Sequence, residues 1–178
     1  MEWILASLIA AAIAYLLGSI NCAVLFSTVF YGDDVRRHGS GNAGTTNMLR
    51  TYGAKAAALT FAGDILKGVF AVVLGRLFFS LLGVTAQQTY GAYLAGYAAI
   101  FGHMYPLYFR FKGGKGVATG LGAVCAINPA VFGVVFTVGI LIAAVSGFVS
   151  LASLSGAVLF PLLLAGSMLL TNGAIAPL

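Results

Sequence analysis

The chain has 178 residues, of which 61% are hydrophobic and 7% charged, and its formal net charge is +5. Soluble proteins have about a quarter of their residues charged, so this composition excludes a soluble globular protein and indicates an integral membrane protein. Because a helix needs about 20 apolar residues to cross a bilayer, the chain has room for roughly six or seven spans. We expect a single transmembrane domain over residues 1–178.

The basic residues gather in two loops. Seven of the nine lysines and arginines lie within residues 36–55 or residues 110–115. Cytoplasmic loops collect lysine and arginine, so we expect both loops to face the cytoplasm. The first apolar run, residues 3–30, is too long for a secretory signal and predicts a retained helix. Ser19 and Asn21 are expected to pack against other helices, although the Asn21 amide could instead reach a bound substrate.

Residues 39–47 read GSGNAGTTN and contain three glycines among hydroxyl and amide side chains. The spacing matches G-x-G-x-x-G, but a dinucleotide site needs a preceding strand in a β-α-β unit, so we set that interpretation aside. Backbone N–H groups freed by glycine, together with polar side chains, favour an anion nest over a purely structural loop. The candidate ligands here are Gly39, Ser40, Gly41, Asn42, Thr46, Asn47 and Arg50.

Two apolar runs, residues 56–82 and residues 89–109, carry buried titratable side chains. Asp64 and Lys67 share one helix face, about 12 and 16 Å from the cytoplasmic end, and His103 lies about 10 Å inside the next span. Such groups are functional candidates by default. Mutual neutralisation explains Asp64 and Lys67 equally well, whereas the matching depth of His103 beside a basic loop favours an active-site wall.

The segment from Arg110 to Gly116 holds three cations and three glycines in seven positions. Charged donors and accessible backbone N–H groups suit a phosphate. A basic loop alone is more often a topology signal, so the phosphate interpretation depends on its meeting residues 39–47. Its candidate ligands are Lys112, Gly113, Gly114, Lys115, Gly116 and Thr119.

Residues 117–127 are too short for an ordinary span, and Asn128-Pro129 should interrupt a helix. Either a short helix is followed by a separate return span over residues 130–146, or residues 117–146 form one kinked helix. We favour two helices, which places Ser150 and Ser153 on the cytoplasmic side. With a span over residues 149–170 and the start of another at residues 174–178, the fold class is an all-α polytopic membrane protein with six complete transmembrane helices and part of a seventh.

Three patches, GSGNAGTTNMLR from Gly39, GHMYPLYFRFKGGKGVATG from Gly102 and VSLAS from Val149, resemble the motifs of the bacterial acyl-phosphate:glycerol-3-phosphate acyltransferase family. The resemblance covers nearly the whole chain. It implies a bacterial inner-membrane enzyme with seven helices, its N-terminus outside and its active site facing the cytoplasm. The implied reaction moves a fatty acyl group from acyl phosphate to the 1-hydroxyl of sn-glycerol 3-phosphate. Lysophosphatidate and inorganic phosphate are the products, in the first acylation step of phospholipid synthesis.

Position by position, the resemblance implies that Ser40, Arg50, Lys115 and Ser153 contact substrate. Family positions are also matched by Asn42, Thr46, Asn47, Asp64, Lys67, His103 and Lys112. The family ends with a seventh helix and a basic tail that carries a histidine, an asparagine and an arginine. This chain stops before both, so either it is truncated at its C-terminus, which we expect, or other residues supply those contacts. The expected partners are the two substrates, membrane lipid and a peripheral enzyme that supplies acyl phosphate, with no nucleic acid, cofactor or metal.

Acyl transfer between two phosphorylated compounds needs two anion patches and stabilisation of an oxyanion. Acyl phosphate has a good leaving group, so we expect direct attack by the glycerol hydroxyl and no serine nucleophile. The catalytic candidates are Ser40 and Lys115, with His103 or Asp64 as base, or a substrate phosphate oxygen in their place. The rival hypothesis is a small anion or phosphate transporter, but no paired broken helices or internal repeat supports it.

Overall fold

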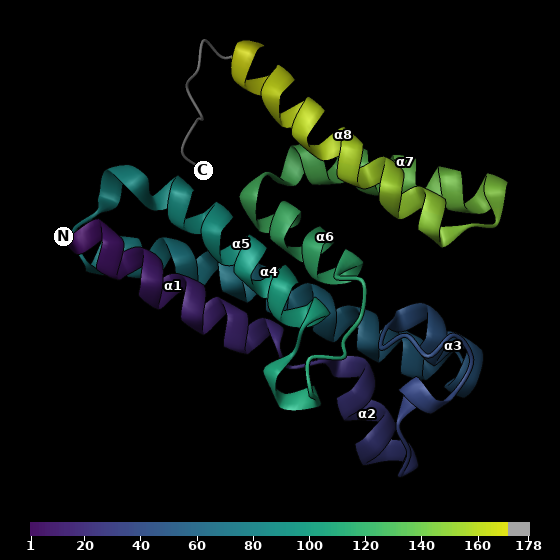
Figure 1. The fold of residues 1–178 in the computed structure, drawn as a ribbon. Helices are drawn as coiled ribbons and strands as arrows, with labels where there is room; N and C mark the ends of the chain where they lie inside the picture. Colours follow the sequence, from purple (N-terminus) through teal and green to yellow (C-terminus); the bar gives the residue numbers. More distant parts are fainter. Residues whose placement is uncertain (171–178) are drawn as a thin grey trace. The chain divides into compact units, whose positions relative to one another are not determined.

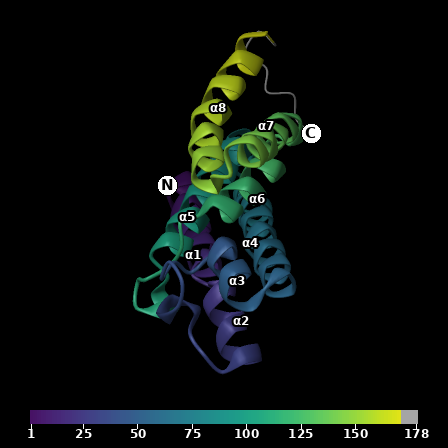
Figure 2. The same ribbon diagram turned by 90° about the vertical axis from the view of Figure 1, so that its right-hand side faces the viewer.

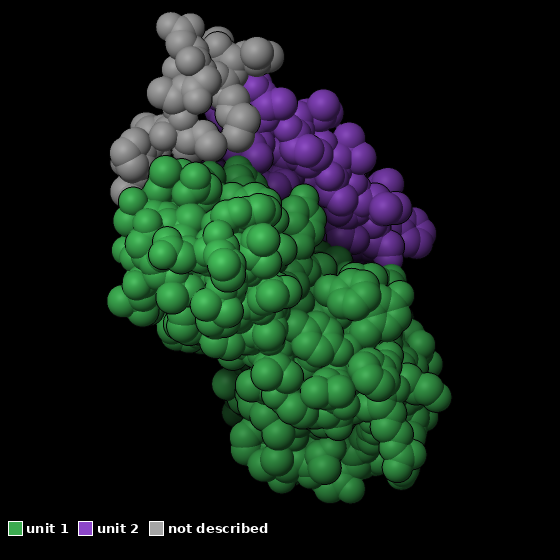
Figure 3. All heavy atoms as spheres, turned by 60° about the vertical axis from the view of Figure 1, so that its left-hand side comes forward, with its two compact units in different colours: residues 1–127 green, residues 128–178 purple. Residues whose placement is uncertain are grey.

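The computed structural model describes residues 1–170, and the regular elements of this part of the chain are all helices (Figure 1). Two compact units divide the chain, residues 1–127 and residues 128–178 (Figure 3). The first unit contains α1 (Glu2–Gly18), α2 (Cys22–Tyr31), α3 (Thr45–Tyr52), α4 (Ala54–Leu81), α5 (Gln88–Met104) and α6 (Val117–Ile127), with the short 3₁₀ helices η1 (Val35–Arg37), η2 (Thr85–Gln87) and η3 (Leu107–Phe109). The second unit contains α7 (Pro129–Ser146) and α8 (Val149–Leu170).

The first apolar run is not the single helix expected over residues 3–30. It breaks after Gly18, and α2 restarts at Cys22 with Asn21 as its N-cap, whose side chain accepts a hydrogen bond from Val24 N at 3.1 Å. The Asn21 amide also donates to Ala43 O at 3.3 Å. Asparagine favours such caps because its short side chain competes with the helical backbone bonds. Asn21 therefore joins the helix break to the loop before α3.

Helices α1, α4, α5 and α6 pack through small residues, so that their backbones touch. An added Cβ on Gly18 would overlap Ala99 O, and one on Gly102 would overlap Tyr15 O, which ties α1 to α5. The α4–α6 contact is built the same way, because a Cβ on Gly122 would overlap Ile65 O. Close approach at small residues is how helices associate in membranes, where lipid is as apolar as their side chains.

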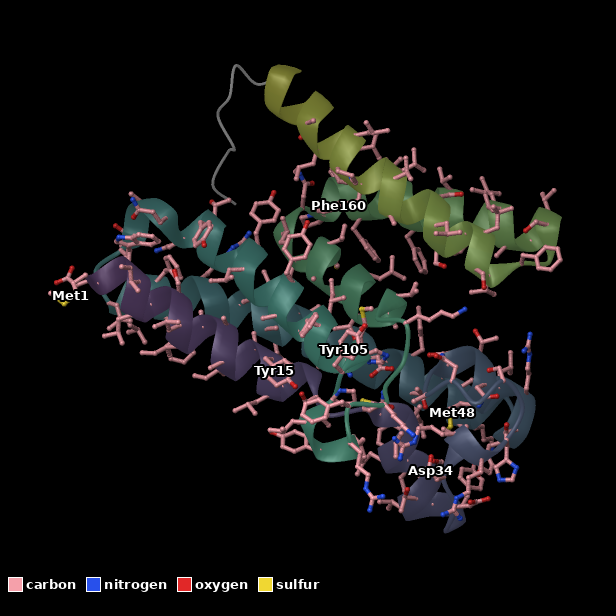
Figure 4. All side chains as sticks on the ribbon, viewed as in Figure 1. Met1, Tyr15, Asp34, Met48, Tyr105 and Phe160 are labelled. Carbon is pink, nitrogen blue, oxygen red and sulfur yellow. The ribbon has the colours of Figure 1, made fainter. Side chains whose placement is uncertain are left out.

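Helix α5 ends at Met104, earlier than the expected residue 109, because Pro106 lacks the N–H that a continuing helix needs. The Tyr15 hydroxyl donates to Tyr105 O at 2.9 Å and fixes the exit of the chain (Figure 4). We call residues 105–116, which lead from here to α6, the basic loop.

The segment between α2 and α4 is not all loop, because α3 occupies residues 45–52. Its Met48 is fully buried against Val35, Ala43 and Ala56. Figure 2 shows α2 and α3 at the same end of the first unit. We call residues 32–44 the first loop, and α3 carries its last polar residues.

Residues 117–146 form two helices, as favoured from the sequence. Asn128 has extended backbone angles and its side chain accepts from Val131 N at 3.1 Å, so it caps α7 directly after α6 ends. In the described chain, the segments long and apolar enough to cross a membrane are Glu2–Tyr31, Ala54–Leu81, Pro129–Ser146 and Val149–Ser167. Six complete spans and a single domain therefore stay predictions. The expected start of a seventh span, at residues 174–178, lies outside the described residues.

Candidate active site

Asp64, Lys67 and His103 form a buried polar cluster between α4 and α5. Lys67 Nζ lies 2.8 Å from Asp64 Oδ1 and 2.8 Å from His103 Nδ1, and it donates to Ile20 O at 2.7 Å. The exposed fractions of the three residues are 1%, 4% and 3% in chain order. The depths counted along the two runs put Asp64 and His103 at similar levels, and the structure brings them together through Lys67. Charges so buried are stable only when they are paired and hydrogen bonded, and here both conditions hold for Lys67.

The cluster also assigns the histidine tautomer. An ammonium group has donors and no acceptor, so Lys67 donates to Nδ1 and the proton of neutral His103 is on Nε2. His103 Nδ1 is 3.5 Å from Asp64 Oδ1. The Nε2 atom lies next to Gly114, where an added Cβ would overlap both His103 Nε2 and Ala43 O. His103 thus connects the buried cluster to the place where the two loops meet.

Asn47 organises the first loop from inside. Its Nδ2 donates to Val35 O at 2.9 Å and to His38 O at 3.0 Å, and its Oδ1 accepts from Ser40 N at 3.0 Å. With 1% of its surface exposed, Asn47 fixes the backbone that presents Ser40. Gly39 has φ +54° and lies against the Asn47 side chain, so both its conformation and its space favour glycine.

The outer surface of this region carries the other predicted ligands of the first motif. Ser40, Gly41, Thr46 and Arg50 are exposed, and Asn42 is half-buried. Thr46 lies in the first turn of α3 and Arg50 in its last turn. Hydroxyls, a guanidinium and a helix N-terminus on one surface suit an anionic ligand.

The glycines of the basic loop serve its fold directly. Gly113 N donates to Met104 O and Gly114 N to His103 O, each at 3.2 Å, so these N–H groups complete the C-terminal end of α5. We had expected them to be directed at a ligand. An added Cβ at Gly113 would overlap His103 O, and Gly116 has φ +78°. Lys112 and Lys115 are exposed, and they provide the positive charge of this loop.

The two loops meet in the first unit, as the phosphate interpretation required. Gly114 packs on Ala43 O, and Arg36 of the first loop donates to Phe109 O at 3.0 Å and to Lys112 O at 2.9 Å. The sequence analysis did not identify Arg36 as the residue that links the two loops. The available signal was Asp34, two residues earlier, whose carboxylate can orient the guanidinium. Its guanidinium lowers the pKa of Asp34 below the usual value through their hydrogen bonds. Figure 4 shows Asp34 at the end of the unit away from Met1.

Three further candidates lie outside the two loops. Thr119 is fully buried in the first turn of α6, and its hydroxyl is without a hydrogen-bond partner in the described structure. Ser150 and Ser153 lie in the second unit at the start of α8, where Ser153 Oγ donates to Ser150 O at 2.9 Å. A shared site of these serines with the two loops stays a prediction.

A hollow of about 390 Å³ lies elsewhere, between the start of α1 and the α4–α5 connection. Its lining includes Glu2, Trp3 and Gln87, and Glu2 is the charged side chain among the lining residues. With 17 residues in α1, this hollow is about 25 Å from the helix break. The Glu2 carboxylate disfavours an anionic ligand in this hollow, and a site at the loops stays a prediction. Among the described residues no three His, Cys, Asp or Glu side chains group closely enough for a metal.

Comparisons with known proteins agree on one class. The profile of a family described as glycerol-3-phosphate acyltransferase matches residues 8–176. A glycerol-3-phosphate acyltransferase of Thermoanaerobacter sp. (strain X514) is 43% identical over 157 residues, which cover 88% of this chain and 75% of the relative. One of Clostridioides difficile (strain 630) is 44% identical over 149 residues, covering 84% and 72%.

Solved structures give the same result. The crystal structure of PlsY (YgiH), an integral membrane glycerol 3-phosphate acyltransferase, in its glycerol 3-phosphate form, matches with a TM-score of 0.79 at 37% identity. The match covers 90% of this chain and 77% of that one. Its lysophosphatidic acid form matches with a TM-score of 0.77, also at 37% identity.

Proposed function

Because the chain belongs to the glycerol-3-phosphate acyltransferase family, we propose that it transfers a fatty acyl group from acyl phosphate to the 1-hydroxyl of sn-glycerol 3-phosphate. The chain is an integral membrane acyltransferase, and the family's place is in phospholipid biosynthesis. Lysophosphatidate and inorganic phosphate are the proposed products. The observation that carries the proposal is the contact between two cation-bearing loops at one end of the first unit, made by Arg36, Ala43 and Gly114.

Two anionic substrates need two sets of donors. In this proposal Ser40 and Arg50, with Thr46 and Asn42 nearby, bind one phosphate, and Lys112 and Lys115 bind the other. The exposure of the loop residues supports their access to substrates. Charge-assisted hydrogen bonds from guanidinium and ammonium groups are the strong donors that phosphate recognition uses.

Phosphate is a good leaving group, so the proposed reaction is a direct transfer of the acyl group without a covalent enzyme intermediate. The 1-hydroxyl oxygen attacks the acyl carbonyl carbon, the bond from that carbon to the phosphate oxygen breaks, and the hydroxyl proton goes to a phosphate oxygen. Lys115 and Ser40 stabilise the negative charge that develops on the carbonyl and phosphate oxygens. Most of the rate enhancement then comes from positioning and charge placement.

The buried cluster argues against His103 as the base. Its Nδ1 accepts from Lys67, and Nε2 carries the proton, so the neutral ring has no free lone pair to accept another proton. Asp64 lies next to Lys67 and is 1% exposed, which keeps it from the substrates. We therefore assign His103, Asp64 and Lys67 the role of holding α4, α5 and the helix break in place.

We also propose that the chain lies in the bacterial inner membrane, with its N-terminus outside and both loops in the cytoplasm. The clustering of seven of nine lysines and arginines in these loops supports this orientation. A peripheral enzyme that delivers acyl phosphate would approach the same face. A reporter fused before Met1 that is active only outside the cytoplasm tests the orientation.

The decisive assay gives the purified chain labelled glycerol 3-phosphate with either acyl phosphate or acyl-CoA at equal concentration. We expect labelled lysophosphatidate with acyl phosphate, and its loss in Lys115→Met but not in Lys55→Met, which removes an exposed lysine at the start of α4. Product from acyl-CoA alone would overturn the proposed donor. Uptake of label into vesicles without any acylated product would favour a transporter.

A further inference from the structure

Arg36 connects two segments that are more than 70 residues apart in the chain. Its Nη1 donates to Phe109 O at 3.0 Å and to Lys112 O at 2.9 Å, separations of 73 and 76 residues. Its Nε donates to both Asp34 carboxylate oxygens at 3.0 Å, and its Nη2 donates to Asp34 Oδ2 at 2.6 Å. All three guanidinium nitrogens therefore form hydrogen bonds within the protein. Arg36 thus differs from Arg50, which we propose as a ligand of substrate phosphate.

The carbonyls that Arg36 binds lie on either side of a strained turn. Arg110 and Phe111 both have φ 58°, and they are the non-glycine residues with positive φ in the described chain. Left-handed backbone is unfavourable for residues with a Cβ, so two such residues in sequence need support from their surroundings. Phe111 is 55% exposed, so packing gives little of that support.

The support comes from hydrogen bonds around the turn. Phe111 N donates to Pro106 O at 2.9 Å and Lys112 N to Phe109 O at 3.3 Å, and Arg36 joins the flanking carbonyls to the first loop. Asp34 fixes the guanidinium by a bidentate pair, whose geometry a lysine cannot reproduce. Lys112 directly follows the Arg110–Phe111 turn. The conformation of this turn therefore sets the position of Lys112 and of the backbone that continues to Lys115.

We propose that Arg36 is a positioning residue for acyl transfer, which locks the left-handed Arg110–Phe111 turn against the first loop so that Lys112 and Lys115 share a site with Ser40 and Arg50. The assignment rests on the proposed function for its catalytic consequence. The structural part, that Arg36 holds the basic loop closed, stands without it.

The neighbouring arginine provides a matched control. Arg37 has the same charge and sits one residue further along, but 78% of its side chain is exposed and its ion pair is with Asp33, at 3.8 Å. Arg36→Ala and Arg37→Ala therefore change the net charge equally and differ in the link to the basic loop.

The first measurement is limited trypsin digestion of the full chain in detergent micelles, followed by mass spectrometry of cleavage after Arg110, Lys112 and Lys115. Loss of a hydrogen-bonded charged group typically shifts an opening equilibrium by about tenfold or more, so Arg36→Ala should be cleaved about tenfold faster than Arg37→Ala. Asp34→Asn, which keeps the arginine but weakens its orientation, should fall between them. Equal cleavage of the two arginine variants would overturn the proposal.

The second measurement is kcat/KM for lysophosphatidate formation, with a rescue that a general loss of stability would not show. Arg36→Ala should lower kcat/KM by about tenfold, equivalent to about 1.4 kcal/mol. Adding Phe111→Gly should recover at least about threefold of it, because glycine adopts positive φ without a steric penalty. Arg36→Lys should recover less, since one nitrogen replaces three. A decrease in Arg36→Ala that Phe111→Gly leaves unchanged would overturn the positioning role.

The two arms separate the inference from the proposed function. Absence of lysophosphatidate from the unmodified chain with acyl phosphate would refute the proposed function and, with it, the catalytic consequence. The digestion would then still decide whether Arg36 holds the basic loop, because it needs no activity.

Discussion

Lys67→Met tests the buried cluster most directly. The substitution keeps an unbranched side chain as far as the ε position but removes the ammonium partner of Asp64, which is 1% exposed. Breaking a buried ion pair by removing one partner costs about 3–5 kcal/mol, because the other charge stays buried. Once Lys67 no longer donates to it, His103 can carry its proton on Nδ1 instead and donate towards Asp64 Oδ1, 3.5 Å away, so we expect the lower end of that range. For a chain of this size the melting temperature should fall by about 6–12 °C.

The assay is thermal unfolding in one detergent, with Lys55→Met as the control because this lysine is exposed on the same helix. The double variant Asp64→Leu with Lys67→Met should recover most of the loss, since removing both charges leaves none unpaired in the apolar interior. If Lys67→Met melts with the control, or if the double variant is no more stable than the single, the cluster is not the buried charge pair described here.

Three further predictions concern the loops. Lys115→Ala should lower kcat/KM by about 10²–10³-fold as expected for an electrostatic contact in the transition state, and His103→Ala should lower it less; the reverse order in steady-state kinetics would show that charge placement does not dominate. Gly114→Ala should abolish most activity, because its Cβ would overlap His103 Nε2 and Ala43 O, whereas Gly133→Ala, with open space around it, should match the unmodified chain in the same assay. The lowered pKa of Asp34 means that its pair with Arg36 stabilises fully above the unfolded pKa of about 3.9 and is lost as the pH falls through the folded value. The melting difference between Asp34→Asn and the unmodified chain should therefore shrink from pH 6 to pH 3, and a constant difference would contradict the pairing.

The sequence predicted the parts of the site whose position follows from counting along helices. Asp64 and His103 were expected at matching depth from the 1.5 Å rise per residue, and they meet through Lys67. Asn128-Pro129 was expected to stop a helix, and Asn128 caps α7. In both cases the controlling interaction is local or lies on a regular helix, so spacing alone contains the information.

The missed features depend on partners that are distant in sequence. The break at Asn21 is hidden in an apolar run, and the Asn21 side chain is directed by Ala43 O, 22 residues away. In the sequence Arg36 is one charge among several, because its partners Phe109 O and Lys112 O are more than 70 residues away. Gly113 was interpreted as freeing its N–H for a ligand, but that group completes the end of α5. The tertiary fold therefore decides which backbone N–H groups remain available to bind a ligand.

The glycine contacts between helices limit how this protein can evolve. Where Gly18 faces Ala99 O and Gly122 faces Ile65 O, the obstacle to a larger residue is main chain, which no substitution can shrink. No substitution of the facing residue can therefore compensate for a larger residue at Gly18 or Gly122. At Gly63 the obstacle is Cys22 Sγ, 2.7 Å from an added Cβ, so alanine there becomes tolerable once Cys22 is replaced by a smaller residue. Paired variation across relatives should then occur at Gly63 and be absent at the other two glycines.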